Sequence, residues 1–241
     1  MAAQKALSRG TAGRARRSRL VVASPFVRLT GVASVVAAAL MLTHQISQLT
    51  FAFTMSQPLA AATHSLRYGL SLMAMYALLI ALGGLYARQA AAAGRLGLIG
   101  YLVAALGTLL IAGDWWYEAF VGPQIAVLAP ELLKTAPSGS ILIGAAFTFG
   151  SFAIGWVIFG IATYRARVFP RGAAILTVIG GVVGILALSA PFQIPLALAV
   201  GWMGISLLGA GAPEPVGPTS DQRRDAEHQR LAPTPTLTQG P

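Results

Sequence analysis

Six blocks of apolar residues, each as long as a membrane-crossing helix, place the tightest limit on how this chain can fold. A transmembrane helix needs about 20 mainly apolar residues. Charged residues make up only 10% of the chain, whereas a soluble domain carries about 25%. We therefore expect an all-α, polytopic membrane bundle of six transmembrane helices. The blocks cover residues 27–51, 67–86, 96–116, 140–164, 172–190 and 194–210.

The basic residues set the expected orientation. Lysine and arginine concentrate in the cytoplasmic loops of membrane proteins. If the N-terminus is cytoplasmic, the only basic residues in the outer connectors are Arg67 and Lys134. The two inner connectors then hold five arginines, namely Arg88, Arg95, Arg165, Arg167 and Arg171. The distribution predicts a multi-pass protein of the cell membrane with both the N-terminus and the C-terminus cytoplasmic.

The two ends of the chain differ in composition from its centre. Residues 1–26 are predicted to form a basic, mostly disordered cytoplasmic arm that is attracted to anionic membrane lipids. Nucleic acid is not expected as its partner. Residues 27–210 form the transmembrane domain, with an interfacial segment near 117–138. Residues 211–241 are rich in proline, threonine, glutamine and charge, which predicts a disordered cytoplasmic tail.

Several chemistries are excluded by what the sequence lacks. Without cysteine the chain has no disulfide, thiolate metal site or cysteine nucleophile. Its only histidines are His44, His64 and His228, too few for an expected zinc site, so no metal is predicted. No glycine-rich phosphate loop with its lysine is present, the apolar blocks hold no lysine for retinal, and paired histidines for haem are missing. We therefore expect no cofactor.

Polar residues gather near one predicted membrane surface. His44 and Gln48 lie one turn apart on the first helix, and Asp114 and Glu118 lie one turn apart at the end of the third. At about 1.5 Å per residue, His44 lies about 24 Å and Asp114 about 27 Å from the inner ends of their helices. The two are thus at similar depth in the outer leaflet, and Arg67 opens the second helix on that side.

Because polar groups at membrane depth are costly, this cluster is the best candidate site. We expect His44, Asp114 and Glu118 to face one another, with Arg67 as counter-ion. The catalytic residues remain unknown, with Asp114, Glu118 and His44 as candidates. The alternative is an aromatic belt around Trp115, with both carboxylates in water. The predicted ligand-binding set is His44, Gln48, Arg67, Asp114, Trp115 and Glu118.

The connector from 117 to 138 is long but apolar. Pro123 and Pro130 interrupt it, so it is not expected to cross the membrane. We expect an interfacial segment with a short helix beginning near Pro130. It either covers the outer mouth as a lid or lies flat among lipid headgroups.

Small residues at helix-packing spacing predict close contact between helices. The pairs are Gly180 with Gly184, Ser140 with Gly144 and Gly97 with Gly100. Packing within the bundle is the preferred interpretation. Contact with a second copy of the chain or with a membrane partner protein is the alternative.

Two patches resemble a loose group of uncharacterised multi-pass integral membrane proteins from high-GC, actinobacterial-type genomes. They are residues 113–121 followed by Pro123, and residues 167–174 at the start of a helix. The resemblance implies a multi-pass membrane fold and no particular activity. Asp114 and Glu118 are also similar to the membrane-embedded acids of small integral-membrane terpene cyclases. Those proteins have a second acid in their last helix, and block 194–210 has none.

Three classes of function remain open. The first is an integral membrane protein that binds a lipid, a hydrophobic small molecule or a partner protein at the outer cluster. The second is an intramembrane enzyme on a hydrophobic substrate, with Asp114 or Glu118 as acid. The third is a small transporter or export accessory, although the inner halves of the helices offer almost no polar path.

Overall fold

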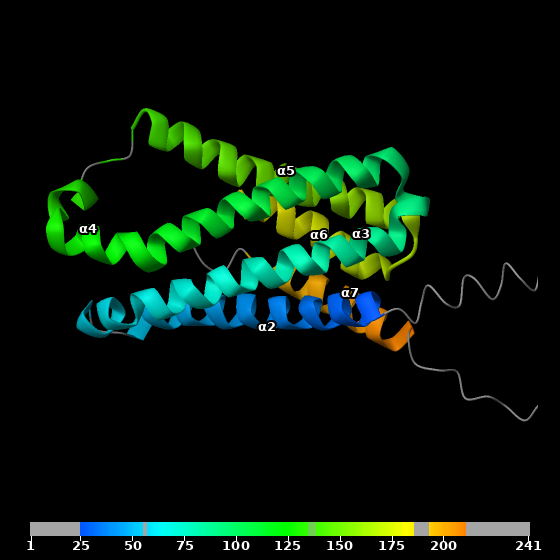
Figure 1. The fold of residues 1–241 in the computed structure, drawn as a ribbon, viewed down its shortest axis with the longest axis horizontal. Coiled ribbons are helices and arrows are strands. Elements are labelled where there is room, and N and C mark those ends of the chain that lie inside the picture. The colour runs from blue at the N-terminus through cyan, green and yellow to red at the C-terminus, as the bar shows by residue number, and fades with distance from the viewer. Residues whose placement is uncertain (1–24, 55–56, 135, 137, 186–192, 211–241) are drawn as a thin grey trace, which may run out of the picture. The chain divides into compact units, whose positions relative to one another are not determined.

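Helices make up nearly all of the described part of the chain, and short turns connect them. The computed structural model describes residues 25–54, 57–134, 136, 138–185 and 193–210. Its long helices are α2 (Pro25–Thr54), α3 (Gln57–Trp116), α5 (Ser140–Ala166), α6 (Arg171–Gly184) and α7 (Ile194–Ala210) (Figure 1). No strand occurs among these residues, which confirms the all-α prediction. The predicted disorder of the arm before residue 25 and of the tail 211–241 lies outside the described residues, as does the predicted extension of α6 over 186–190.

Helix α3 is two antiparallel arms joined at Gly94. Gly94 has φ 57° and ψ −148°, a conformation that glycine adopts without a Cβ clash. The rings of Tyr86 and Tyr101 stack with centroids 4.6 Å apart, whereas a straight helix would separate them by about 22 Å. The predicted connector 87–95 is thus mostly helical, and the chain reverses at one residue. We call residues 57–93 the first arm and residues 95–116 the second arm.

The helical segments form a closed circuit. Each packs against the next along the chain, and α7 returns to α2. Neighbouring segments are antiparallel, as the α2–α7 pair shows. A Cβ on Gly31 would meet Leu208, and one on Gly201 would meet Ala38. The beginning of α2 and the end of α7 therefore lie at the same end of the bundle.

Three segments are long and apolar enough to cross a membrane, which supports a membrane protein. They are Pro25–Thr50, Thr63–Leu128, which holds most of the first arm of α3 and all of its second arm, and Ser140–Ala166. The apolar helices Arg171–Gly184 and Ile194–Gly209 are shorter.

Close backbone packing joins the second arm of α3 to α5. A Cβ on Gly107 would overlap the backbone of Phe152, and one on Gly155 would overlap the backbone of Ala104. Helices approach this closely only where a side chain is missing. The aromatic residue Trp156 fills the space beside this contact and is fully buried.

The predicted packing glycines have mixed outcomes. Gly180 contacts Leu196 of α7, and Gly184 contacts Phe152 of α5, as expected for an interface. Gly100 contacts the backbone of Phe159. The prediction for Ser140 with Gly144 is wrong, because a Cβ on Gly144 would meet nothing within 4 Å. The first two turns of α5 extend beyond the point where α6 ends against Phe152.

Candidate functional site

The connector after α3 stays helical and turns on a π-helical segment. Residues Tyr117–Val121 form this π-turn, followed by α4 (Gly122–Leu128) and a 3₁₀ turn (Pro130–Lys134). The short helix expected near Pro130 is present as the 3₁₀ turn, but helical structure begins earlier than predicted. Single π-turns inside α-helices frequently mark functional sites.

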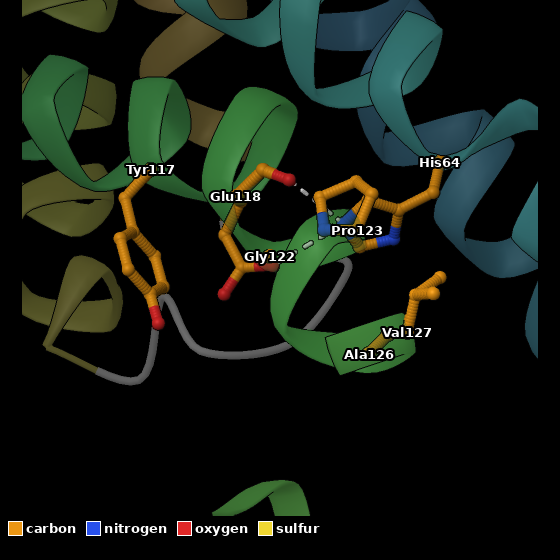
Figure 2. A pocket seen from close by; sticks show the side chains of 7 residues that line it. All are labelled: His64, Tyr117, Glu118, Gly122, Pro123, Ala126 and Val127. Atoms are coloured by element: carbon orange, nitrogen blue, oxygen red, sulfur yellow. Dashed lines mark hydrogen bonds and ion pairs between the residues drawn. The ribbon is translucent and has the colours of Figure 1, made fainter. Parts of the chain in front are cut away.

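A pocket lies between this connector and the first arm of α3, and we call it the α4 pocket. Its volume is about 440 Å³, within the usual range of roughly 300–1,000 Å³ for small-molecule sites. Its wall is apolar apart from one histidine, one carboxylate and one phenol (Figure 2). The lining residues are His64, Tyr117, Glu118, Gly122, Pro123, Ala126 and Val127.

His64 and Glu118 pair inside the α4 pocket. The Nε2 atom of His64 lies 3.3 Å from Oε2 of Glu118 and 3.0 Å from the Glu118 backbone oxygen. Figure 2 shows both interactions, with the imidazole beside Pro123. Since a carbonyl only accepts, His64 carries its proton on Nε2 and donates it to Glu118.

Pro123 explains why the Glu118 carbonyl is available to His64. In the π-turn the N–H of Gly122 bonds to the oxygen of Tyr117, five residues back. The same pattern would pair the Glu118 oxygen with the nitrogen of residue 123, but proline has no N–H to donate. His64 satisfies the acceptor that the proline leaves open, and this holds the histidine at the mouth of the pocket.

A second group of polar side chains is more buried than the His64–Glu118 pair, and we call it the His44 network. Arg67 Nη1 donates to Gln48 Oε1 over 2.9 Å. Because Arg67 can only donate, this bond fixes the orientation of the Gln48 amide. The amide nitrogen then lies 3.4 Å from His44 Nε2 and 3.4 Å from the Tyr68 hydroxyl. The fifth member is Trp115, whose ring centroid lies 5.3 Å from that of His44.

Tyr68 connects the network with the pocket. Its ring centroid lies 4.4 Å from that of His64 and 5.4 Å from that of Trp115. Tyr68 and His64 are not among the site residues predicted from the sequence. The signal that could have found them is their spacing of four residues, which puts both on one face at the start of the first arm.

The structure brings together part of the predicted site. His44, Gln48, Arg67 and Trp115 lie in one network, and Glu118 lies in the pocket beside it. Among the described residues, no hydrogen bond or ion pair joins His44 to Asp114 or Glu118. Asp114 is half-buried and adjacent to Trp115, so the burial of Trp115 against His44 turns Asp114 to another face of the helix.

No protein-family model matches this chain, and no curated protein or solved structure matches it either. Within the described ranges, no group of three histidine or acidic side chains is placed to hold a metal ion. The pocket and the network therefore provide the available chemistry, namely one acid–base pair, several neutral hydrogen-bonding groups and an apolar wall.

Proposed function

We propose that the chain crosses the cell membrane six times with both ends cytoplasmic. The antiparallel circuit supports this proposal, since an alternating closed circuit needs an even number of segments. Charge supports it too, because six exposed arginines lie at the Gly94 end, whereas the described acids, Asp114, Glu118 and Glu131, lie at the other end. The arginines are Arg28, Arg88, Arg95, Arg165, Arg167 and Arg171.

Cysteine labelling tests this topology cleanly, because the chain has no cysteine of its own. We expect Ser138→Cys to react with a membrane-impermeant maleimide on intact cells. Ala92→Cys, beside the Gly94 turn, should react only after the membrane is permeabilised. The reverse pattern would overturn the orientation, and labelling of both on intact cells would show that the second arm of α3 does not cross the membrane and so overturn the six spans.

The α4 pocket supports a proposal for function, the binding of an amphiphilic molecule. One observation carries it: an apolar pocket of about 440 Å³ whose rim holds the His64–Glu118 pair. The apolar part of the ligand would lie against Pro123, Ala126 and Val127. A hydroxyl, amide or amine on its head would bond to the Glu118 carboxylate. Membrane lipids and hydrophobic small molecules have this chemistry.

Native mass spectrometry of the detergent-purified protein tests the binding proposal. Val127→Trp fills the pocket and should abolish a discrete bound mass, while Glu118→Gln should reduce it. Glu131→Gln is the matched control, because it removes an acid of the same connector that does not line the pocket. Loss of the mass in all three variants would contradict a specific site, as would a wild-type protein that never carries one.

The geometry also favours a second candidate, an intramembrane enzyme. His64 and Glu118 form an acid–base pair at 3.3 Å on the wall of an apolar pocket. In this case Glu118 acts as the acid, and the uncommitted Asp114 lies one turn before it. Glu118→Gln should then stop conversion of the bound molecule but leave it bound. A ligand recovered chemically unchanged from both wild type and variant favours the binding function.

A further inference from the structure

We infer that the bundle encloses a second site, beside Nδ1 of His44, that holds a neutral hydroxyl-bearing ligand such as water. It lies between α2, the second arm of α3 and the start of α7. It goes beyond the proposed function, since none of its residues lines the α4 pocket.

Of the buried polar atoms that lack a hydrogen-bond partner in the described part of the chain, four point to this site. They are His44 Nδ1, Gln45 Oε1, Trp115 Nε1 and Gln193 Nε2. Their side chains are enclosed, because these residues are only 3%, 4%, 7% and 2% exposed. In a membrane, lipid supplies no hydrogen bonds, so each such atom must be satisfied from within the protein.

The folded chain places these atoms at one level of the bundle. His44 and Gln45 are consecutive on α2, and the Trp115 ring lies 5.3 Å from His44 between centroids. Gln193 immediately precedes α7. Helix α7 runs antiparallel to α2, with Gly204 against Ser34 and Gly201 against Ala38. Continued by two turns, this register brings residue 193 level with residue 45.

The chemistry of the four atoms defines the ligand. The tautomer of His44 decides whether its Nδ1 donates or accepts, because the Gln48 amide nitrogen and the backbone of Arg67 both approach the ring. Trp115 and Gln193 present donors, Gln45 presents an acceptor, and the neutral His44 ring presents one or the other at Nδ1. None of the four groups carries a formal charge in this form. An O–H group both accepts and donates, and buried water typically makes about three hydrogen bonds.

The two ring nitrogens of His44 contact different surroundings, and this locates the enclosed site next to the His44 network. Nε2 belongs to the His44 network that leads through Gln48 and Tyr68 to the α4 pocket. Nδ1 is left for the enclosed site. His44 therefore lies between a protein-satisfied network and a group of atoms that the protein leaves unsatisfied.

Indole resonances of the full-length protein test the inference. The chain has four tryptophans, and each Nε1–H signal of a ¹⁵N-labelled sample in nanodiscs is assigned with one Trp→Phe variant. We expect a water cross-peak in a water-selective exchange experiment at Trp115. Trp156 is the matched control, because its buried Nε1 donates to Thr108 Oγ1 over 3.2 Å and should show none.

Two sources of the hydroxyl group are distinguishable. Water gives a cross-peak at the water frequency. A bound alcohol gives cross-peaks to its carbon-bound CH–OH protons, together with a co-purified mass in native spectra. Either result supports the site. A resolved Trp115 signal with neither cross-peak, beside a normal Trp156 signal, would overturn it.

Gln45→Leu adds a second test that does not depend on the α4 pocket. The substitution removes the acceptor at nearly constant side-chain size, so the Trp115 cross-peak should fall to the noise while the Trp156 signal stays in place. An unchanged cross-peak at Trp115 would remove Gln45 from the site and overturn the arrangement proposed here. Occupancy of the α4 pocket, measured on the same sample, should not change, so the two proposals fail independently.

Discussion

Two buried tryptophans, Trp156 and Trp115, sit in opposite kinds of surroundings. Trp156 is fully enclosed by the glycine-lined contact of α3 and α5, and its indole nitrogen donates to Thr108. Thr108 passes its own proton to the backbone oxygen of Ala104 over 2.7 Å. Trp115 is almost as buried, yet its indole nitrogen has no partner in the described chain.

The difference separates the part of the bundle that provides stability from the part that provides chemistry. Around Trp156 helix backbones touch and the polar atoms are paired within the protein, which leaves no role for a ligand. Around Trp115 the polar atoms outnumber their protein partners, and the α4 pocket opens nearby. Buried polar atoms that lack a hydrogen-bond partner within the protein occur mainly at functional sites.

The largest effect is expected at the glycine contact. Gly155→Ala would place a Cβ into the backbone of Ala104, and neither backbone can move without displacing a helix. We expect a loss of about 3 kcal/mol of stability, in the upper range for overpacked cores. Thermal unfolding followed by detergent size-exclusion chromatography measures it.

Gly150→Ala is the control on the same helix. A Cβ there would meet nothing within 4 Å, and alanine favours a helix over glycine by about 1 kcal/mol. This variant should be as stable as the wild type or slightly more stable. An equal loss of stability in both variants would show that the backbones of α3 and α5 are not in close contact at Gly155.

A smaller effect is expected from breaking the Trp156 hydrogen bond. Thr108→Val keeps the side-chain shape but leaves a buried indole N–H unpaired, which costs about 2 kcal/mol. Thr43→Val provides the comparison, because the exposed Thr43 hydroxyl bonds only within its own helix and should change stability little. If Thr108→Val proved neutral, water would reach Trp156 as well, and the division between the two regions would disappear.

The sequence was sufficient for the helices because length and hydrophobicity determine them. The last predicted segment, 194–210, coincides with α7 (Ile194–Ala210), and the predicted start of the fourth coincides with that of α5 at Ser140. These limits follow from local residue type, namely apolar runs bounded by proline, glycine or charge. Depth along a helix was also predictable, because His44, Arg67 and Trp115 do meet in one network.

Rotation about each helix axis was not predictable. Asp114 and Trp115 are neighbours, and only the packing of α2 against the second arm decides which of them faces His44. That packing depends on where backbones can touch, as at Gly84 against Thr30, and these pairs are far apart in the sequence. Gln193 was not predicted as a site residue for the same reason, because it comes level with His44 and Gln45 only when α7 packs beside α2.

The smallest effect is expected at Pro123, and it tests how the α4 pocket holds His64. Pro123→Ala restores a backbone N–H that can bond to the Glu118 oxygen in the π-turn and so competes with His64. Replacing one neutral hydrogen bond by another shifts the balance by about 1 kcal/mol, or roughly fivefold in population. The ¹⁵N shift of His64 Nε2 should move toward that of an exposed histidine, whereas His44 should not change. An unchanged His64 signal would mean that the Glu118 carboxylate alone holds the ring, so that the contact of His64 Nε2 with Glu118 Oε2 shapes the pocket, rather than the missing N–H of Pro123.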